Sequence, residues 1–137
     1  MLEFYYSCKV TADIEKVVDF FSRSENLLKI TPLSFLFSLE GKSKLENGDI
    51  IKVKLFGHDI MESLITNVSK EGFIDNGVKR PLGIKYWEHR HSFKPSGNKT
   101  LIEDRLKIDS AIPYAFIKPL LDYLFSYRCK KVKLLLE

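Results

Sequence analysis

The sequence has few cysteines and no cysteine motif. Only Cys8 and Cys129 occur in 137 residues, far apart and with no CxxC spacing. Small secreted domains held by disulfides and zinc knuckles have a denser and more regular cysteine pattern, so both classes are excluded. We therefore interpret the two cysteines as small core residues of a cytoplasmic protein.

Long apolar runs are also absent. The most apolar stretch, 111–127, is interrupted by Lys118, Pro119 and Asp122 and is shorter than a membrane span requires. The first twenty residues alternate in polarity and do not place a basic segment before an apolar block, so no secretory signal is predicted. We expect no stable membrane insertion.

The excess of positive charge is small. The chain has 22 Lys and Arg against 18 Asp and Glu, and the one dense basic cluster lies near the C-terminus, at Arg128, Lys130, Lys131 and Lys133. We interpret this cluster as a solvated helix end that complements the helix dipole, and expect no nucleic-acid partner. With 45% hydrophobic residues and no repeat or linker, residues 1–137 are predicted to form one globular domain.

Hydrophobic periodicity predicts a strand, two short helices, six strands and a long helix. Residues 2–10 alternate like a strand with one buried face, and apolar residues recur at helical spacing between Thr11 and Phe21. A second helical piece, 25–30, ends before Pro32, and the last helix begins near Tyr114. The strand-like runs between them are 34–40, 49–56, 59–68, 72–76, 84–94 and 99–110. This order favours an α+β fold in which a curved, seven-stranded antiparallel sheet surrounds the C-terminal helix.

The turn at 95–98 suggests a register for the last hairpin. Pairing Lys94 with Lys99 sets Glu88 opposite Arg105 and Arg90 opposite Glu103, as expected for a solvent-exposed face. The inner face then carries Trp87, His89, His91, Phe93, Ile102 and Asp104, with His89 opposite Asp104.

Two further carboxylates are predicted on the inner face. A hairpin around Gly57 and His58 pairs residue 53 with Glu62, and a shorter one pairs residue 66 with Asp75. An otherwise apolar hollow would then contain Glu62, Asp75, His89, His91 and Asp104. Burying these groups costs several kcal/mol unless they pair, bind water or contact a ligand.

The two histidines admit three interpretations. The Cα atoms of residues i and i+2 of a strand are about 7 Å apart on one face, which can suit two ligands of one metal, with Asp104 as a third. They could instead form an acid–base pair, but no nucleophile, oxyanion donor or cofactor motif accompanies them. We expect a polar anchor with no metal and no cofactor, in which Asp104 bonds to His89 and raises its pKa.

The last helix presents one apolar stripe. Ile117, Leu121, Leu124 and Phe125 are part of it, and Arg128 lies on the same side. Arg128 could extend to solvent, or could pair with an inner carboxylate or a ligand anion.

Several segments together resemble a known superfamily. The segment 21–32 reads FSRSENLLKITP, and it is followed by FID at 73–75, WEHRHSF at 87–93 and FSYR at 125–128. This pattern resembles the ligand-binding branch of the START/Bet v 1-like (SRPBCC) superfamily over nearly the whole chain. The resemblance implies a helix-grip fold with an internal hydrophobic cavity, in a group that includes lipid carriers, hormone receptors and aromatic polyketide cyclases. The sequence departs from this pattern at Arg80, where relatives often have glycine, and at Glu62, where they often have tryptophan.

We therefore expect a protein that binds a small, largely hydrophobic or amphipathic molecule, and favour binding over catalysis. One alternative is a cofactor-free cyclase, dehydratase or isomerase that uses His89, His91 and Asp104. Another is an interaction module whose own side chains fill the cavity. The predicted ligand-binding residues are Glu62, Asp75, Trp87, His89, His91, Phe93, Ile102, Asp104, Leu121 and Arg128.

Overall fold

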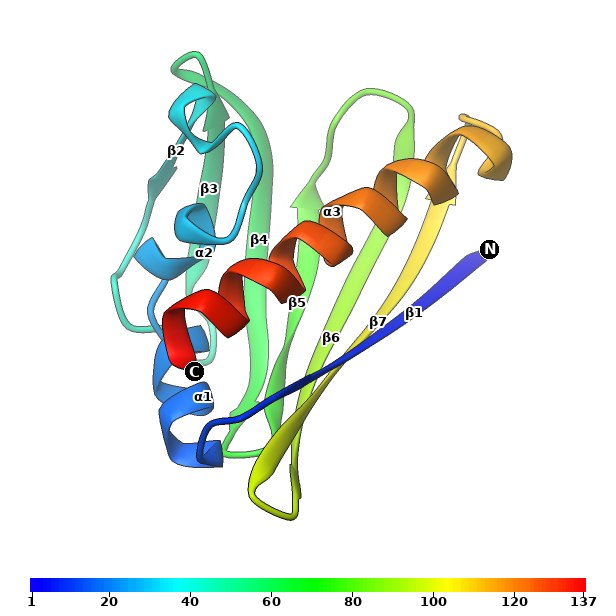
Figure 1. Ribbon diagram of the computed structural model, residues 1–137. Coiled ribbons are helices and arrows are strands. Elements are labelled where there is room, and N and C mark those ends of the chain that lie inside the picture. Colours follow the sequence, from blue (N-terminus) through cyan, green and yellow to red (C-terminus); the bar gives the residue numbers. More distant parts are fainter.

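A curved antiparallel sheet surrounds a long C-terminal helix in the computed structural model, which describes all 137 residues (Figure 1). This arrangement confirms the predicted α+β fold. The elements are β1 (Leu2–Val10), α1 (Ile14–Phe21), α2 (Glu25–Lys29), the 3-10 helix η1 (Ser34–Leu36), β2 (Phe37–Glu40), β3 (Ile50–Leu55), β4 (His58–Ser69), β5 (Gly72–Lys79), β6 (Ile84–Ser96), β7 (Lys99–Ser110) and α3 (Tyr114–Leu136).

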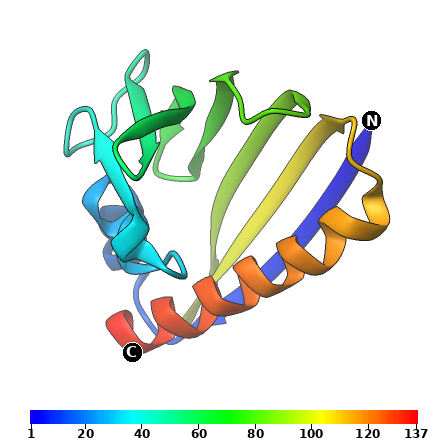
Figure 2. The same cartoon turned by 90° about the horizontal axis from the view of Figure 1, so that it is seen from above.

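The seven strands are ordered β1-β7-β6-β5-β4-β3-β2. Strands β2 to β7 follow one another as hairpins, and β1 joins the outer edge of β7. Seen from above, the sheet bends so that α3 crosses its concave side, and α1 and α2 lie between the β2 edge and the C-terminal end of α3 (Figure 2). No helix is both long and apolar enough to cross a bilayer.

Helix α3 packs on the sheet through residues spaced three to four apart or by multiples of that spacing, which places them on one face. Toward its N-terminal end, Leu121 and Phe125 pack with Phe4 and Leu106 in one buried cluster. Toward its C-terminal end, Val132 joins a second cluster. The middle of the sheet, from β3 to β5, is left without helix contacts of this kind, and the cavity described below lies there.

The predicted register of the β6–β7 hairpin is wrong by two residues. Ser96 pairs with Lys99, so the turn contains only Gly97 and Asn98, and Glu88 lies opposite Lys107 while Arg90 lies opposite Arg105. Gly97 has a φ of +63°, which allows a two-residue hairpin turn at this position. A shift of two leaves every side chain on its predicted face, so His89 and His91 point inward as expected.

The predicted register of the β3–β4 hairpin is wrong by two residues at the turn and by one residue from Val53 onward, and Glu62 consequently points outward. Its turn consists of Phe56 and Gly57, both with positive φ, and an irregularity follows after Val53. Lys52 lies opposite Glu62, and their side chains form an ion pair of 3.8 Å. A one-residue shift exchanges the two faces of a strand, so Ser63 takes the inward place expected for Glu62.

Cys8 and Cys129 form a disulfide, which corrects the prediction of two unpaired core cysteines. Their Cα atoms are 5.9 Å apart, although 121 residues separate them in the sequence. The pairing depends on β1 and α3 lying side by side, which no local sequence pattern reveals. Because disulfides persist mainly in oxidising compartments, the expectation of a cytoplasmic location loses the support that unpaired cysteines gave it.

Candidate functional site

A cavity of about 290 Å³ lies between the concave face of the sheet, α2 and α3. Its walls are mainly apolar, and it is partly open to solvent. Hydrophobic lining residues come from the helices and from five strands, among them Phe20, Leu27, Leu28, Phe37, Val53, Met61, Ile65, Phe73, Leu124 and Phe125. The volume is at the lower end of those that hold small organic ligands.

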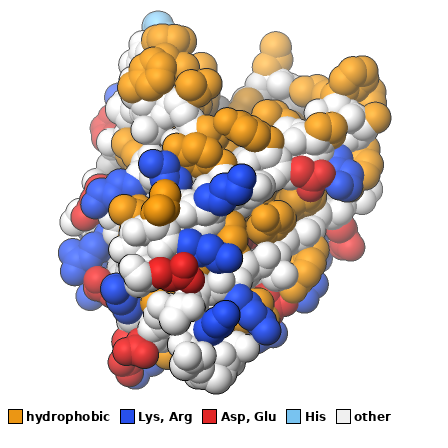
Figure 3. Space-filling model, viewed as in Figure 1, with side chains coloured by type: hydrophobic (Ala, Val, Ile, Leu, Met, Phe, Trp, Pro, Cys, Tyr) orange, Lys and Arg blue, Asp and Glu red, His pale blue; other side chains and the backbone are white.

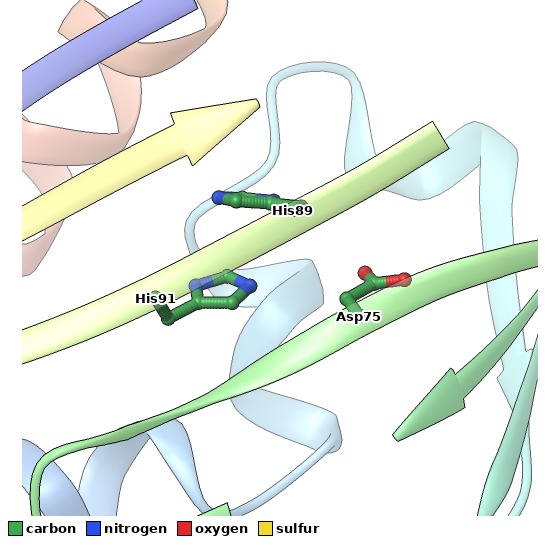
Figure 4. A group of neighbouring side chains, drawn as sticks. All are labelled: Asp75, His89 and His91. Carbon is green, nitrogen blue, oxygen red and sulfur yellow. The ribbon is translucent and has the colours of Figure 1, made fainter. Parts of the chain in front are cut away.

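One wall of the cavity is polar because adjacent strands place ionisable side chains together. Asp75 of β5 lies directly opposite His89 of β6, and Phe73 lies opposite His91. Asp75 and the two imidazoles project from the two strands into the same space (Figure 4). The ring of His91 is stacked between the rings of Phe73 and His89, with centroid distances of 4.2 and 3.7 Å.

Asp104 of β7 lies behind the histidines and contacts both. His89 Nε2 is hydrogen-bonded to Asp104 Oδ1 at 2.8 Å, and His91 Nδ1 lies 3.3 Å from the same oxygen without hydrogen-bond alignment. Burial would raise the pKa of Asp104, but the contacts with the two imidazoles outweigh it and hold this pKa far below its usual range. Asp104 is therefore a buried anion.

Both histidines are neutral at physiological pH. Burial lowers the pKa of His89 despite its hydrogen bond to Asp104, so our expectation of a raised pKa is wrong. Burial, together with the adjacent His89 ring, lowers the pKa of His91 to about 4. Each side chain is only about 5% exposed, and the loss of hydration exceeds the attraction of one carboxylate.

Three polar atoms of the wall are buried and have no hydrogen-bond partner. They are Asp75 Oδ1, Trp87 Nε1 and His91 Nδ1. Burial raises the pKa of Asp75, although His91, Ser63 and Arg128 oppose the change. Because native proteins leave few buried polar groups unpaired, atoms of this kind beside an open volume indicate a place for a polar ligand group or water.

Arg128 faces the cavity, which decides between its two predicted positions. Its guanidinium lines the cavity and lies 5.4 Å from the centre of the Phe125 ring. Burial lowers its pKa, and Asp104 and Asp75 oppose that change, but Arg128 forms no ion pair or hydrogen bond with either carboxylate. An arginine has five N–H donors, so this side chain can bind an acceptor inside the cavity.

The geometry does not favour a metal ion, although Asp75, His89 and His91 each have a possible ligand atom within 4.8 Å of the others. The two imidazole rings are stacked at 27° with their centroids 3.7 Å apart, so their lone pairs lie in separate, nearly parallel planes, which is unfavourable for binding one ion between them. His89 Nε2 is already bonded to Asp104, and the nearby charge of Arg128 would repel a cation.

The predicted site residues separate into three groups. Asp75, Trp87, His89, His91 and Arg128 line the cavity. Phe93, Ile102 and Leu121 are buried in the hydrophobic core, and Asp104 lies behind His89, where it borders a minor hollow of about 10 Å³. Glu62 lies on the outer face of the sheet.

Sequence reasoning missed the cavity residues of α2 and the true inner face of β4. Leu27 and Leu28 of α2 line the cavity, as do Met61 and Ser63 of β4. For β4, the charge of Glu62 was the available signal: an alternation with Glu62 outward puts Met61, Ser63 and Ile65 together on the other face.

Solved structures share this architecture at low sequence identity. A START superfamily protein from Mycobacterium smegmatis has a TM-score of 0.74 and 14% identity, covering 96% of this chain and 94% of its own. Norcoclaurine synthase from Thalictrum flavum, in complex with dopamine and hydroxybenzaldehyde, has a TM-score of 0.69 and 17% identity, with 96% and 86% covered. The di-domain ARO/CYC protein StfQ of the steffimycin biosynthetic pathway has a TM-score of 0.75 and 10% identity, with 96% and 49% covered.

These similarities establish the fold. The chain shares the fold of these proteins, as its sequence resemblance implied. No protein-family model matches the sequence, and a search of the curated proteins finds no match.

Proposed function

We propose that this protein binds a small, largely hydrophobic molecule in the cavity between the sheet and α3. The observation that supports this most directly is the open cavity of about 290 Å³. Most of its walls are apolar, and its one polar wall contains buried atoms that have no hydrogen-bond partner. An interaction module with a filled cavity would not leave this space open. The volume favours a compact ligand over a lipid with two acyl chains.

The polar wall specifies one end of the ligand. Trp87 Nε1–H and the Arg128 guanidinium can donate hydrogen bonds, and Asp75 Oδ1 can accept one. A complementary ligand has a hydrogen-bond acceptor close to a hydroxyl or N–H donor, attached to a ring system or short hydrocarbon that contacts the apolar walls. Such a molecule would satisfy all three protein groups without burying an unpaired charge.

An acid–base reaction on such a ligand is the second candidate. Burial raises the pKa of Asp75 and lowers the pKa of His91, so it favours the protonated form of the carboxyl group and the neutral form of the adjacent imidazole. Adjacent groups with pKa values displaced in opposite directions are typical of acid–base sites. In a cofactor-free cyclase, dehydratase or isomerase, Asp75 would donate a proton and His91 would remove one. Asp104 would keep His89 in place.

Titration with an apolar fluorescent probe tests the binding proposal. The folded protein should bind the probe at micromolar concentration, a free energy of about 8 kcal/mol. Met61→Trp adds a large side chain to the cavity wall and should weaken binding at least about tenfold. Leu64→Trp is the matched control, because Leu64 lies on the opposite face of the same strand and should leave binding unchanged. Equal binding by both variants would place the probe on an external surface and refute the proposal.

Native mass spectrometry of the protein as purified identifies a retained ligand. Incubating that compound with the wild-type chain, Asp75→Asn and His91→Gln then separates binding from catalysis. Conversion by the wild type alone supports the acid–base alternative, and an unchanged compound in all three samples supports binding without reaction.

A further inference from the structure

Large apolar side chains are exposed at one end of the molecule. Leu33 before η1, Phe35 within it, Phe56 at the β3–β4 turn, Leu82 in the β5–β6 loop and Phe116 near the start of α3 are each more than 60% exposed. These segments all lie toward the upper end in Figure 1, spread across it from the η1 side to the start of α3. Figure 3 shows hydrophobic side chains at both raised tips of this end, with a notch between them. We call this region the apolar end.

Two of these side chains are held out by unfavourable backbone conformations. Leu33 has a φ of +55° and Phe56 a φ of +51°, in the left-handed region that bulky residues rarely adopt. Strand β4 contains Asn67 at the same φ of +55°, in an irregularity between Thr66 and Ser69 near the other end of the sheet. Asparagine is the residue type suited to this geometry. Strain that persists at exposed apolar tips indicates a role outside the fold's own stability.

The segments that carry the exposed apolar side chains are basic, although acidic residues adjoin them at Asp59, Glu88 and Asp122. Segments 28–38, 53–58, 78–87 and 111–121 form the apolar end and contain no aspartate or glutamate. Their basic residues are Lys29, Lys54, Lys79, Arg80, Lys85 and Lys118. Lys54 pairs with Glu40 and Asp59, and Lys118 pairs with Asp122, whereas the other four form no ion pair. A surface that accepts the apolar tips must therefore tolerate or prefer positive charge beside them.

We propose that the apolar end docks on an anionic lipid surface, with its tips in the headgroup region and its basic residues against lipid phosphates. Interfacial binding combines apolar insertion with attraction between lysine or arginine and acidic lipids. The tips are separated by a notch, which a deformable bilayer accommodates better than a rigid protein face does. A second copy of the chain would place basic residues against basic residues. This docking does not depend on the cavity being occupied.

Vesicle flotation with the intact chain tests the proposal. Vesicles of phosphatidylcholine containing about 30% phosphatidylserine should carry the protein with them, and pure phosphatidylcholine vesicles should bind at least about tenfold more weakly. Raising the salt concentration from about 0.1 M to 1 M, which shortens the screening length from about 10 Å to 3 Å, should release much of the bound protein. No binding to the anionic vesicles overturns the proposal.

Two substitutions separate docking from folding. Phe56→Asn and Leu33→Asn remove an apolar tip and place a residue suited to positive φ, so vesicle binding should fall about tenfold or more while thermal stability stays equal or rises. Leu134→Ser is the matched control, because Leu134 is equally exposed but lies in the last turn of α3. Vesicle binding that persists in both asparagine variants overturns the proposal. A second result would also overturn it. If the wild-type protein does not bind vesicles but dimerises as its concentration rises, and these variants abolish the dimer, the apolar end serves self-association.

The same variants distinguish this proposal from ligand binding in the cavity. Phe56→Asn should bind the fluorescent probe like the wild type, and Met61→Trp should dock on vesicles like the wild type. Loss of both activities in either variant would show that the two sites are not independent and would overturn the docking proposal as stated.

Discussion

Asp104 is the residue on which the polar group depends. A fully buried carboxylate is costly unless it is paired and hydrogen-bonded, and here a single oxygen contacts two imidazoles that are themselves neutral. The Asp104 carboxylate is therefore stabilised by the dipoles of neutral imidazoles, and no positively charged group contacts it. It also fixes the His89 ring, because the hydrogen bond to Nε2 leaves only Nδ1 free.

Acid should unfold the protein through the histidines. The unfolded chain binds a proton on His91 near pH 6.5, whereas the folded protein does so only near pH 4, so His91 contributes stability that is fully present above about pH 6.5. Between pH 6.5 and 4 the free energy of unfolding should fall by about 3 kcal/mol from this group. Urea unfolding at a series of pH values measures the loss.

Three other groups around His91 modify this pH dependence. His89 adds to the loss because its pKa is also lowered, whereas Asp75, with a raised pKa, contributes stability at low pH that fades as the pH rises. The positive charge of Arg128 disfavours protonation of both histidines. His91→Gln should therefore flatten the stability curve, and Asp75→Asn should steepen it. A curve for His91→Gln parallel to that of the wild type would contradict the assignment.

Removing the charge of Asp104 should lower the pKa of His89 further. Asp104→Asn eliminates the electrostatic attraction that partly offsets burial. An NMR titration of the histidine ring protons measures the shift, and Glu103→Gln on the neighbouring, outward position of β7 is the control. A rise of the His89 pKa in Asp104→Asn would show that the carboxylate does not act as described.

At the scale of elements, the disulfide connects the first strand to the last helix. Val10 and Val132, which pack in the same cluster close to Cys8 and Cys129, are completely buried, so this junction is among the best packed parts of the molecule. Because the closed loop includes nearly the whole chain, loss of the disulfide mainly increases the freedom of the unfolded state.

Replacing both cysteines should destabilise the fold without changing it. Cys8→Ala with Cys129→Ala should lower the free energy of unfolding by about 2–5 kcal/mol, measured by urea unfolding. Adding a reducing agent to the wild-type protein should have a similar effect, and it should not affect the double variant. A wild-type protein that is unchanged by reduction would show that the disulfide is not formed in solution.

At the scale of the whole molecule, ligand binding and stability are linked. A molecule that binds only the folded cavity at about 100 times its dissociation constant should raise the free energy of unfolding by about 2.7 kcal/mol. Thermal unfolding with increasing probe should show a rising Tm for the wild type and for Leu64→Trp, and little change for Met61→Trp. A Tm that rises equally in all three would place the binding site outside the cavity.

The sequence by itself determined the order of the strands and α-helices, the α+β class and the inward faces of β5 and β6, but not the 3-10 helix at Ser34–Leu36, which lies in a segment predicted as strand. These features follow from periodicity and from turn residues, which act over a few neighbours. Asp75, His89 and His91 were found on the cavity wall for this reason, and the two-residue error in the last hairpin did no harm because side-chain direction repeats every second residue.

Only the tertiary structure decided the register of β3 and β4, the disulfide, the direction of Arg128 and the pKa of His89. A one-residue irregularity between Val53 and Lys54 turned Glu62 outward; the charge of Glu62 favours that face, but nothing local in the sequence marks the irregularity itself. The other three depend on which distant elements come together and how completely they exclude water. The desolvation of a side chain and its contacts with distant residues depend on every element that packs around it. They therefore cannot be predicted from its neighbours along the chain.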